Sequence, residues 1–274
     1  MKNNEKGFIF ETLKSRYNMN IARTGNPALN KNTFTGFAYR EEASVMTIQG
    51  TVNKIAIMLL LVLGGAFYTW RMAFEAMQTD PVTASGTILP WMIGGGIGGF
   101  VVAMITIFKR SWAGITGPIY AILEGLFLGG ISAFFESRYP GIVIQAVALT
   151  FAILFALLFA YKTRIIKPTQ NFRLGVFAAT GGVMMLYLVS FLLNLFGAPV
   201  GYLHDNSLLS IGISVVIVII ASLNLVLDFD FIEQGADSSA PKYMEWYAAF
   251  GLMVTLIWLY IEILRLLSKI ASRD

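Results

Sequence analysis

The chain has 274 residues, of which 56% are hydrophobic and only 13% are charged. Soluble domains are about half apolar with about a quarter of their residues charged, so this composition excludes an ordinary soluble protein. The absence of cysteine also excludes disulfides, thiolate nucleophiles and zinc–thiolate sites. The net charge of +4 does not indicate nucleic-acid binding, because Lys and Arg mostly flank apolar blocks, as they do beside membrane spans.

Residues 1–49 form a polar segment with seven Lys and Arg and four Glu residues, which we interpret as a soluble N-terminal tail. The first apolar block begins only near Ile55, so no cleavable signal peptide is expected. The first span would then direct insertion itself. Residues 50–274 form a single predicted membrane domain.

Seven apolar blocks follow the tail, most of them about twenty residues long, which is the length needed to cross about 30 Å of hydrocarbon. They cover residues 54–71, 86–108, 114–135, 141–162, 174–196, 208–230 and 243–267. The connections are short and hold turn-forming residues, as in TDPVTASG, RYPG and FGAPVGYLHDN. We therefore predict an all-α polytopic membrane protein with seven transmembrane helices.

The distribution of basic residues predicts the orientation of these spans. Eight lie in the tail together with Lys54, and the connection after the second span carries Lys109 and Arg110. The connection after the fourth span holds four more, whereas the opposite loops hold few. The positive-inside rule then places the N-terminus in the cytoplasm. Seven spans would put the C-terminus outside, although three basic residues near it argue mildly against that side.

The glycines of the second span match a nucleotide-binding motif by letter alone. Gly94, Gly96 and Gly99 fit G-x-G-x-x-G, but that fingerprint requires a strand before it and a helix opening after it. Here it lies within a span, where small residues let helices approach closely. We predict the same packing role for small residues of other spans: Ala121, Gly125, Gly129, Ala133, Gly64, Gly65, Gly181 and Gly182.

Glu124 lies about ten residues into the third span, near the predicted midplane of the bilayer. A carboxylate at that depth is costly unless it has a partner, a proton or a water-filled cavity. One interpretation is a protonated Glu that hydrogen-bonds a neighbouring helix. The other, which we favour, is a carboxylate that binds a proton or a cation.

Asp228 lies one or two turns before the end of the sixth span, four residues after Asn224 and on the same helix face. Asp230 and Glu233 continue towards the interface. Acids near a helix end can simply be solvated. However, the C-terminal end of a helix is the unfavourable end of its dipole for acids. We therefore favour a proton or cation site at Asp228.

The seventh span adds two further acids. Glu245 begins this span and can sit opposite Asp228 across the short connection. Glu262 shares a helix face with Thr255 and is followed three residues later by Arg265. The Glu262–Arg265 spacing is more typical of an interfacial ion pair than of a site.

These acids are suited to cation handling. Ca²⁺ prefers several hard oxygen ligands, and two carboxylates in a low-dielectric gap share a proton and titrate as a pair. Asp228 and Glu124 are the candidate Ca²⁺ ligands, and no other cofactor is expected. The further ion-binding or gating candidates are Asp230, Glu245 and Glu262, with Lys109 and Arg110 as possible counter-charges. The lone His204 has no second ligand, and we interpret it as a surface residue.

Four stretches give the chain a family resemblance. They read MTIQGTVNKIAIMLLL, FKRSWAGITGPIYAILEGLFLGGIS, VLDFDFIEQGA and EWYAAFGLMVTLIWLYIEILRLL. Their order and spacing, over about residues 46–267, resemble the Bax inhibitor-1 family, and a bacterial branch of it in particular. The resemblance implies a seven-helix fold with a central helix enclosed by the others, and a pH-dependent Ca²⁺ leak.

The same resemblance implies a role for Asp228. In the family, an Asp near the end of the sixth helix pairs with an Asp of the seventh, and Asp228 in LDFDFI matches the first of them. Thr255 stands at the second place, so this chain departs from the pattern there. Asp230, Glu245 or Glu262 would have to supply the second acid.

Two functions therefore compete. The first is a pH-sensitive cation (Ca²⁺) leak channel in a bacterial inner membrane, and the alternative is a non-conducting regulator that binds a membrane protease or stress-response partner. An enzyme is disfavoured, because no nucleophile–base pair is evident and one histidine cannot build a zinc site. A proton-coupled transporter stays open, although no pair of broken helices marks a substrate site.

Overall fold

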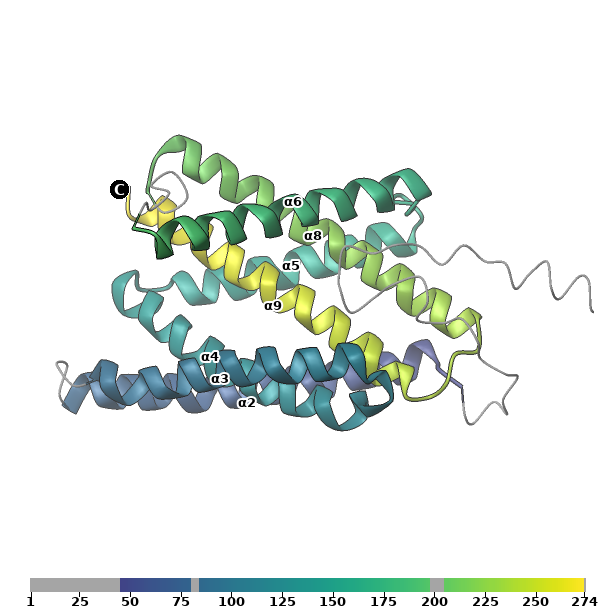
Figure 1. Cartoon of the computed structure of the whole chain (residues 1–274), viewed down its shortest axis with the longest axis horizontal. Coiled ribbons are helices and arrows are strands. Elements are labelled where there is room, and N and C mark those ends of the chain that lie inside the picture. The colour runs from purple at the N-terminus through teal and green to yellow at the C-terminus, as the bar shows by residue number, and fades with distance from the viewer. Residues whose placement is uncertain (1–44, 80–83, 198–204, 274) are drawn as a thin grey trace, which may run out of the picture.

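The structure is a computed structural model that describes residues 45–79, 84–197 and 205–273. Nearly all of the predicted tail lies outside the described residues, and so does His204. Every regular element in these ranges is a helix (Figure 1). In chain order they are α2 (Ile48–Thr79), α3 (Ala84–Phe108), the 3₁₀ helix η3 (Arg110–Trp112), α4 (Ala113–Arg138), α5 (Ile142–Lys162), α6 (Gln170–Leu195), α8 (Leu208–Asp237) and α9 (Met244–Ala271).

Seven of these helices are long and apolar enough to cross a membrane, which confirms the predicted polytopic all-α class. The largest difference from the sequence prediction is α2, which begins before residue 54 and continues past residue 71 to Thr79. Its start is fixed by Thr47, whose Oγ1 accepts a hydrogen bond from Gly50 N, and it contains no proline. At 1.5 Å per residue α2 is about 48 Å long, so its ends extend beyond the hydrocarbon.

The last helix, α9, occupies the middle of the bundle. In Figure 1, α2, α3 and α4 lie together on one side, α6 and α8 lie on the other, and α9 crosses obliquely between them. In the most apolar stretch of α9, 67% of the residues are buried, against 44% or less in every other span. The enclosed central helix that the family resemblance implies is therefore α9.

Small residues bring α2 and α4 into close contact, as their spacing predicts. A Cβ atom added to Gly129 would lie 2.1 Å from the carbonyl oxygen of Ala66, and one added to Gly125 would lie 2.4 Å from that of Val62. On the α2 side, a Cβ at Gly65 would lie 2.7 Å from the carbonyl oxygen of Ile122. Any larger residue at these three positions would push the helices apart.

The glycine prediction is wrong for four residues, one of which lies in α3. Gly64, Gly181 and Gly182 have no described atom within 4 Å of an added Cβ, so they serve no close packing there. In α3, Gly94 also has no such neighbour, whereas the predicted Gly96 and Gly99 face side chains of α4. The close backbone contact comes from Gly95, where an added Cβ would lie 2.6 Å from the carbonyl oxygen of Leu123. Helical pattern alone does not say which glycine faces a neighbouring helix.

Hydroxyl caps fix the starts of two helices that carry polar residues. Thr169 accepts a hydrogen bond from Phe172 N at the start of α6, which places Arg173 in the first turn. Ser207 accepts from Ser210 N at the start of α8. These caps set the register of the side chains discussed below.

Candidate functional site

The acids of α8 and α9 gather where these two antiparallel helices are joined. We call this the hairpin end of the bundle, defined by the last turns of α8 (Asp228 to Asp237), the connection 238–243 and the first turn of α9. The first two turns of α2, the first turn of α6 and the segment just after α5 reach the same end, because Lys54, Arg173 and Arg164 contact acids there.

Asp228 lies inside the protein, with 1% of its surface exposed. It stands in a fully buried segment of α8 that runs from Asn224 to Ile232. Four residues earlier, the amide of Asn224 donates a 2.8 Å hydrogen bond to Thr180 Oγ1 of α6. The Oδ1 atom of Asn224 is buried and accepts no hydrogen bond from the described residues. Asp228 is therefore not a solvated acid at a helix end.

Two acids that follow Asp228 are paired with bases from other helices. Arg173 of α6 lies 2.7 Å from Asp230, and both side chains are mostly buried. Arg164, beyond the end of α5, lies 2.7 Å from Glu233, which also accepts a hydrogen bond from the Tyr161 hydroxyl. The sequence shows no base between these acids and Lys242. The partners are distant in sequence, and no local spacing indicates them.

Glu245 is bound by α2 rather than by an acid of α8. Its side chain is 0% exposed and forms salt bridges with Lys54 of α2 and with Lys242, the latter at 2.9 Å. The backbone N–H and the hydroxyl of Thr47 each donate a 2.9 Å hydrogen bond to Glu245 Oε1. From its place in the sequence Glu245 could sit opposite Asp228, but these contacts hold its carboxylate against the start of α2.

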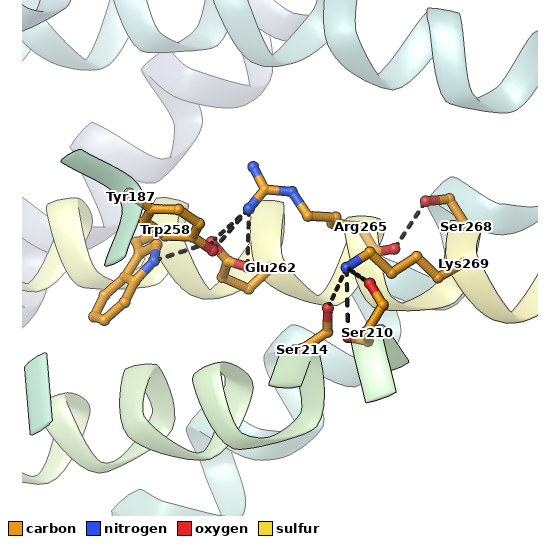
Figure 2. Close-up of polar contacts among 8 residues, drawn as sticks. All are labelled: Tyr187, Ser210, Ser214, Trp258, Glu262, Arg265, Ser268 and Lys269. Carbon is orange, nitrogen blue, oxygen red and sulfur yellow. Dashed lines mark hydrogen bonds and ion pairs between the residues drawn. The ribbon is translucent and has the colours of Figure 1, made fainter. Parts of the chain in front are cut away.

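Glu262 lies further along α9, towards the end of the bundle opposite the hairpin end. Its contacts are drawn in Figure 2. It accepts hydrogen bonds from the Tyr187 hydroxyl at 2.7 Å and from Trp258 Nε1 at 3.2 Å. Arg265 Nη1 lies 3.2 Å from Glu262 Oε1, which confirms the predicted intrahelical pair. Thr255 is buried within α9.

The comparison with known families covers the region just described. The sequence family described as Bax inhibitor 1 like matches residues 26–272. The chain belongs to this Bax inhibitor 1 like family. A search of curated proteins gave no match. The family match includes every membrane helix of the structure, so the resemblance carried by four stretches extends to the whole membrane domain.

The two predicted counter-charges of this Bax-inhibitor-like protein lie against aromatic rings. Lys109 Nζ is 4.3 Å from the centroid of the Trp112 ring, within the same α3–α4 connection. The guanidinium of Arg110 is 5.8 Å from the ring of Tyr247, which is buried near the start of α9. Cations are attracted to the faces of such rings. Arg110 thus reaches the central helix, while Lys109 stays within its own connection.

Glu124, the remaining candidate of this Bax-inhibitor-like protein, is half-buried on α4 and faces α3. A Cβ added to Gly99 of α3 would lie 2.6 Å from Glu124 Oε1, so the glycine makes room for the carboxylate. Glu124 belongs to none of the salt bridges between described residues. Within the described part of the chain, no three acidic, His or Cys side chains lie close enough together to hold a metal ion.

Proposed function

We propose that this Bax-inhibitor-like membrane protein is a pH-sensitive cation leak channel with Ca²⁺ among its permeant ions. The observation that carries the proposal is the burial of Asp228 in the apolar segment of α8. An ionised carboxylate inside a membrane domain is costly without a proton, a cation or a counter-charge. A buried acid in such a place is a functional candidate by default. Ca²⁺ enters this proposal as a passing ion, bound transiently by carboxylates.

Salt bridges at the hairpin end support a closed conformation of such a channel. Asp230 is held by Arg173 of α6, and Glu245 is held by Lys54 of α2. These pairs tie the ends of α8 and α9 to helices on both sides of the bundle. Protonation of Asp230 would weaken its pair with Arg173, because the neutral acid no longer attracts the base. A change in pH would thereby alter the opening of this end.

The proposed location is a bacterial inner membrane, with the hairpin end and the N-terminus in the cytoplasm. The support is the concentration of bases at that end, where Lys54, Arg164 and Arg173 lie. The chain has no native cysteine, so single cysteines can be placed at Ser238 and Ser272 and labelled with an impermeant maleimide on intact cells. Labelling of the Ser238 position from outside would contradict this orientation.

The flux experiment uses purified protein in liposomes, with Ca²⁺ entry measured from pH 6 to 8. Asp228→Asn is compared with Asp237→Asn, which removes an exposed acid from the end of the same helix. We expect a pH-dependent flux in the wild type, a changed rate and pH profile in Asp228→Asn, and an unchanged profile in Asp237→Asn. Flux no greater than that of empty liposomes at every pH would rule out the channel.

One contact favours the second candidate, a non-conducting regulator. Met46 is buried, and its N–H donates a 2.6 Å hydrogen bond to the Ala240 carbonyl in the α8–α9 connection. A partner that binds the preceding tail would therefore act directly on the hairpin end. Its signature would be a stable membrane-protein partner lost on deletion of residues 1–44, together with the absence of flux. Neither function includes a catalytic step.

A further inference from the structure

A cavity lined by both apolar and polar side chains lies at the end of the bundle opposite the hairpin end. It has a volume of about 200 Å³ and lies between α6, α8 and α9. The polar residues that line it are Tyr187, Ser190, Asn194, Ser214, Arg265 and Lys269. Both charged residues in the lining are bases. The volume is far above the roughly 10–15 Å³ that one water molecule needs, so the cavity admits a polyatomic ion.

Lys269 brings a buried ammonium group to this cavity. The residue is only 6% exposed, although lysine is among the residues least often buried. Its Nζ donates 2.8 Å hydrogen bonds to Ser210 Oγ and to Ser214 Oγ, and a longer hydrogen bond of 3.5 Å to the Ser210 carbonyl oxygen, all from α8 (Figure 2). These hydroxyl oxygens are neutral, so they solvate the ammonium without cancelling its charge.

Arg265, one turn before Lys269, supplies the second positive charge. Its hydrogen bonds to Glu262 and to the Tyr187 hydroxyl all use Nη1. Between described residues, no hydrogen bond uses the Nε or Nη2 donors of this guanidinium, so this side of the fork can bind a ligand. Tyr187 therefore holds the guanidinium at the wall of the cavity by a bond from α6.

Two acids lie near these bases but outside the cavity lining. Glu262 is already bound by Tyr187, Trp258 and Arg265. Asp205 precedes α8, where the Ser207 hydroxyl donates a 2.7 Å hydrogen bond to it and lowers the pKa of its carboxyl. Glu262 thus neutralises part of the charge of Arg265 from outside the lining, while the lining itself holds two bases and no acid.

We propose that this cavity binds a phosphate-bearing anion between Arg265 and Lys269. A guanidinium fork, a point-like ammonium and several hydroxyl donors are the groups that recognise phosphate oxygens. The anion can come from two sources with the same chemistry, free inorganic phosphate or the headgroup of a membrane phospholipid. The cavity lies at helix ends, where headgroups are found, so both sources can reach it.

The test uses the full-length protein purified in a nonionic detergent. In one arm, inorganic phosphate is titrated and the thermal unfolding midpoint is followed. In the other, native mass spectrometry counts phosphatidylglycerol molecules retained after extraction. Lys269→Met removes the buried ammonium, and Lys162→Met makes the same substitution at an exposed position at the end of α5. Ser190→Leu fills the cavity from α6 while it keeps both charges.

We expect wild type and Lys162→Met to bind the anion equally, and Lys269→Met and Ser190→Leu to bind it at least about tenfold more weakly. Stabilisation by phosphate without lipid retention identifies the free ion, and lipid retention without a phosphate effect identifies the headgroup. The absence of both in the wild type would overturn the proposal. Binding unchanged in Lys269→Met and in Ser190→Leu would also overturn it.

Discussion

Glu245 offers the sharpest test of how the hairpin end is held together. The change is Glu245→Gln, which keeps the shape of the side chain and removes its charge. The carboxylate now accepts bonds from Lys54, Lys242 and two donors of Thr47. In the variant, the amide nitrogen would face an ammonium group, so one donor would lie against another. We therefore expect a lower free energy of unfolding.

The size of the effect follows from the burial of the groups. Breaking a fully buried ion pair by removal of one partner costs about 3–5 kcal/mol. Glu245 is fully buried, but the side chains of Lys54 and Lys242 are 17% and 48% exposed, so water recovers part of the loss. We expect the free energy of unfolding to decrease by about 3 kcal/mol, mostly from the lost interactions with Lys54 and Thr47.

The assay is equilibrium unfolding in mixed micelles by added dodecyl sulfate, followed by helical circular dichroism. Glu75→Gln is the matched control, because it breaks a pair with Arg71 in which the side chains are 61% and 69% exposed. We expect no measurable change from that exposed pair. If Glu245→Gln and Glu75→Gln had the same free energy of unfolding, the reasoning would be refuted, because burial would then add nothing to the strength of the ion pair.

Two further stability predictions use the same assay. Gly129→Ala should destabilise the fold by about 1–3 kcal/mol, because the new methyl group would lie 2.1 Å from Ala66 O, whereas Gly182→Ala should not, because no described atom lies within 4 Å. Equal free energies of unfolding for these two variants would contradict the close contact between α4 and α2 at Gly129. Asp230→Asn should destabilise the fold more than Glu233→Gln does, because the ion pair of Asp230 is the more buried of the two. The reverse order would show that burial does not determine which of these pairs contributes more.

Much of the fold could be predicted from the sequence because the membrane imposes simple constraints. Apolar length indicates the spans, and small residues four apart indicate the α2–α4 contact at Gly125 and Gly129. The Glu262–Arg265 pair is likewise local, at a spacing of three residues within α9. Each of these signals depends only on residues that are close in the chain.

The polar pairs between helices could not be predicted in this way. Asp230 and Arg173 are 57 positions apart, and which face of α6 meets α8 depends on tertiary packing. The same holds for Lys269 and Ser210, 59 positions apart, and for Glu245 and Lys54, 191 positions apart. In the sequence, the bases indicate only the orientation of the spans. Their partners became visible only in the folded bundle.

The central position of α9 has a consequence for biosynthesis. A ribosome makes the chain from its N-terminus, so six of the described spans enter the membrane before the helix that they enclose. Contacts within α2, α3 and α4 can form early, but the Glu245 contacts with Thr47 and Lys54 must wait for the seventh span. Until then the six earlier spans lack the helix that they enclose in the finished protein. In this interval their inner faces are accessible to membrane chaperones and proteases.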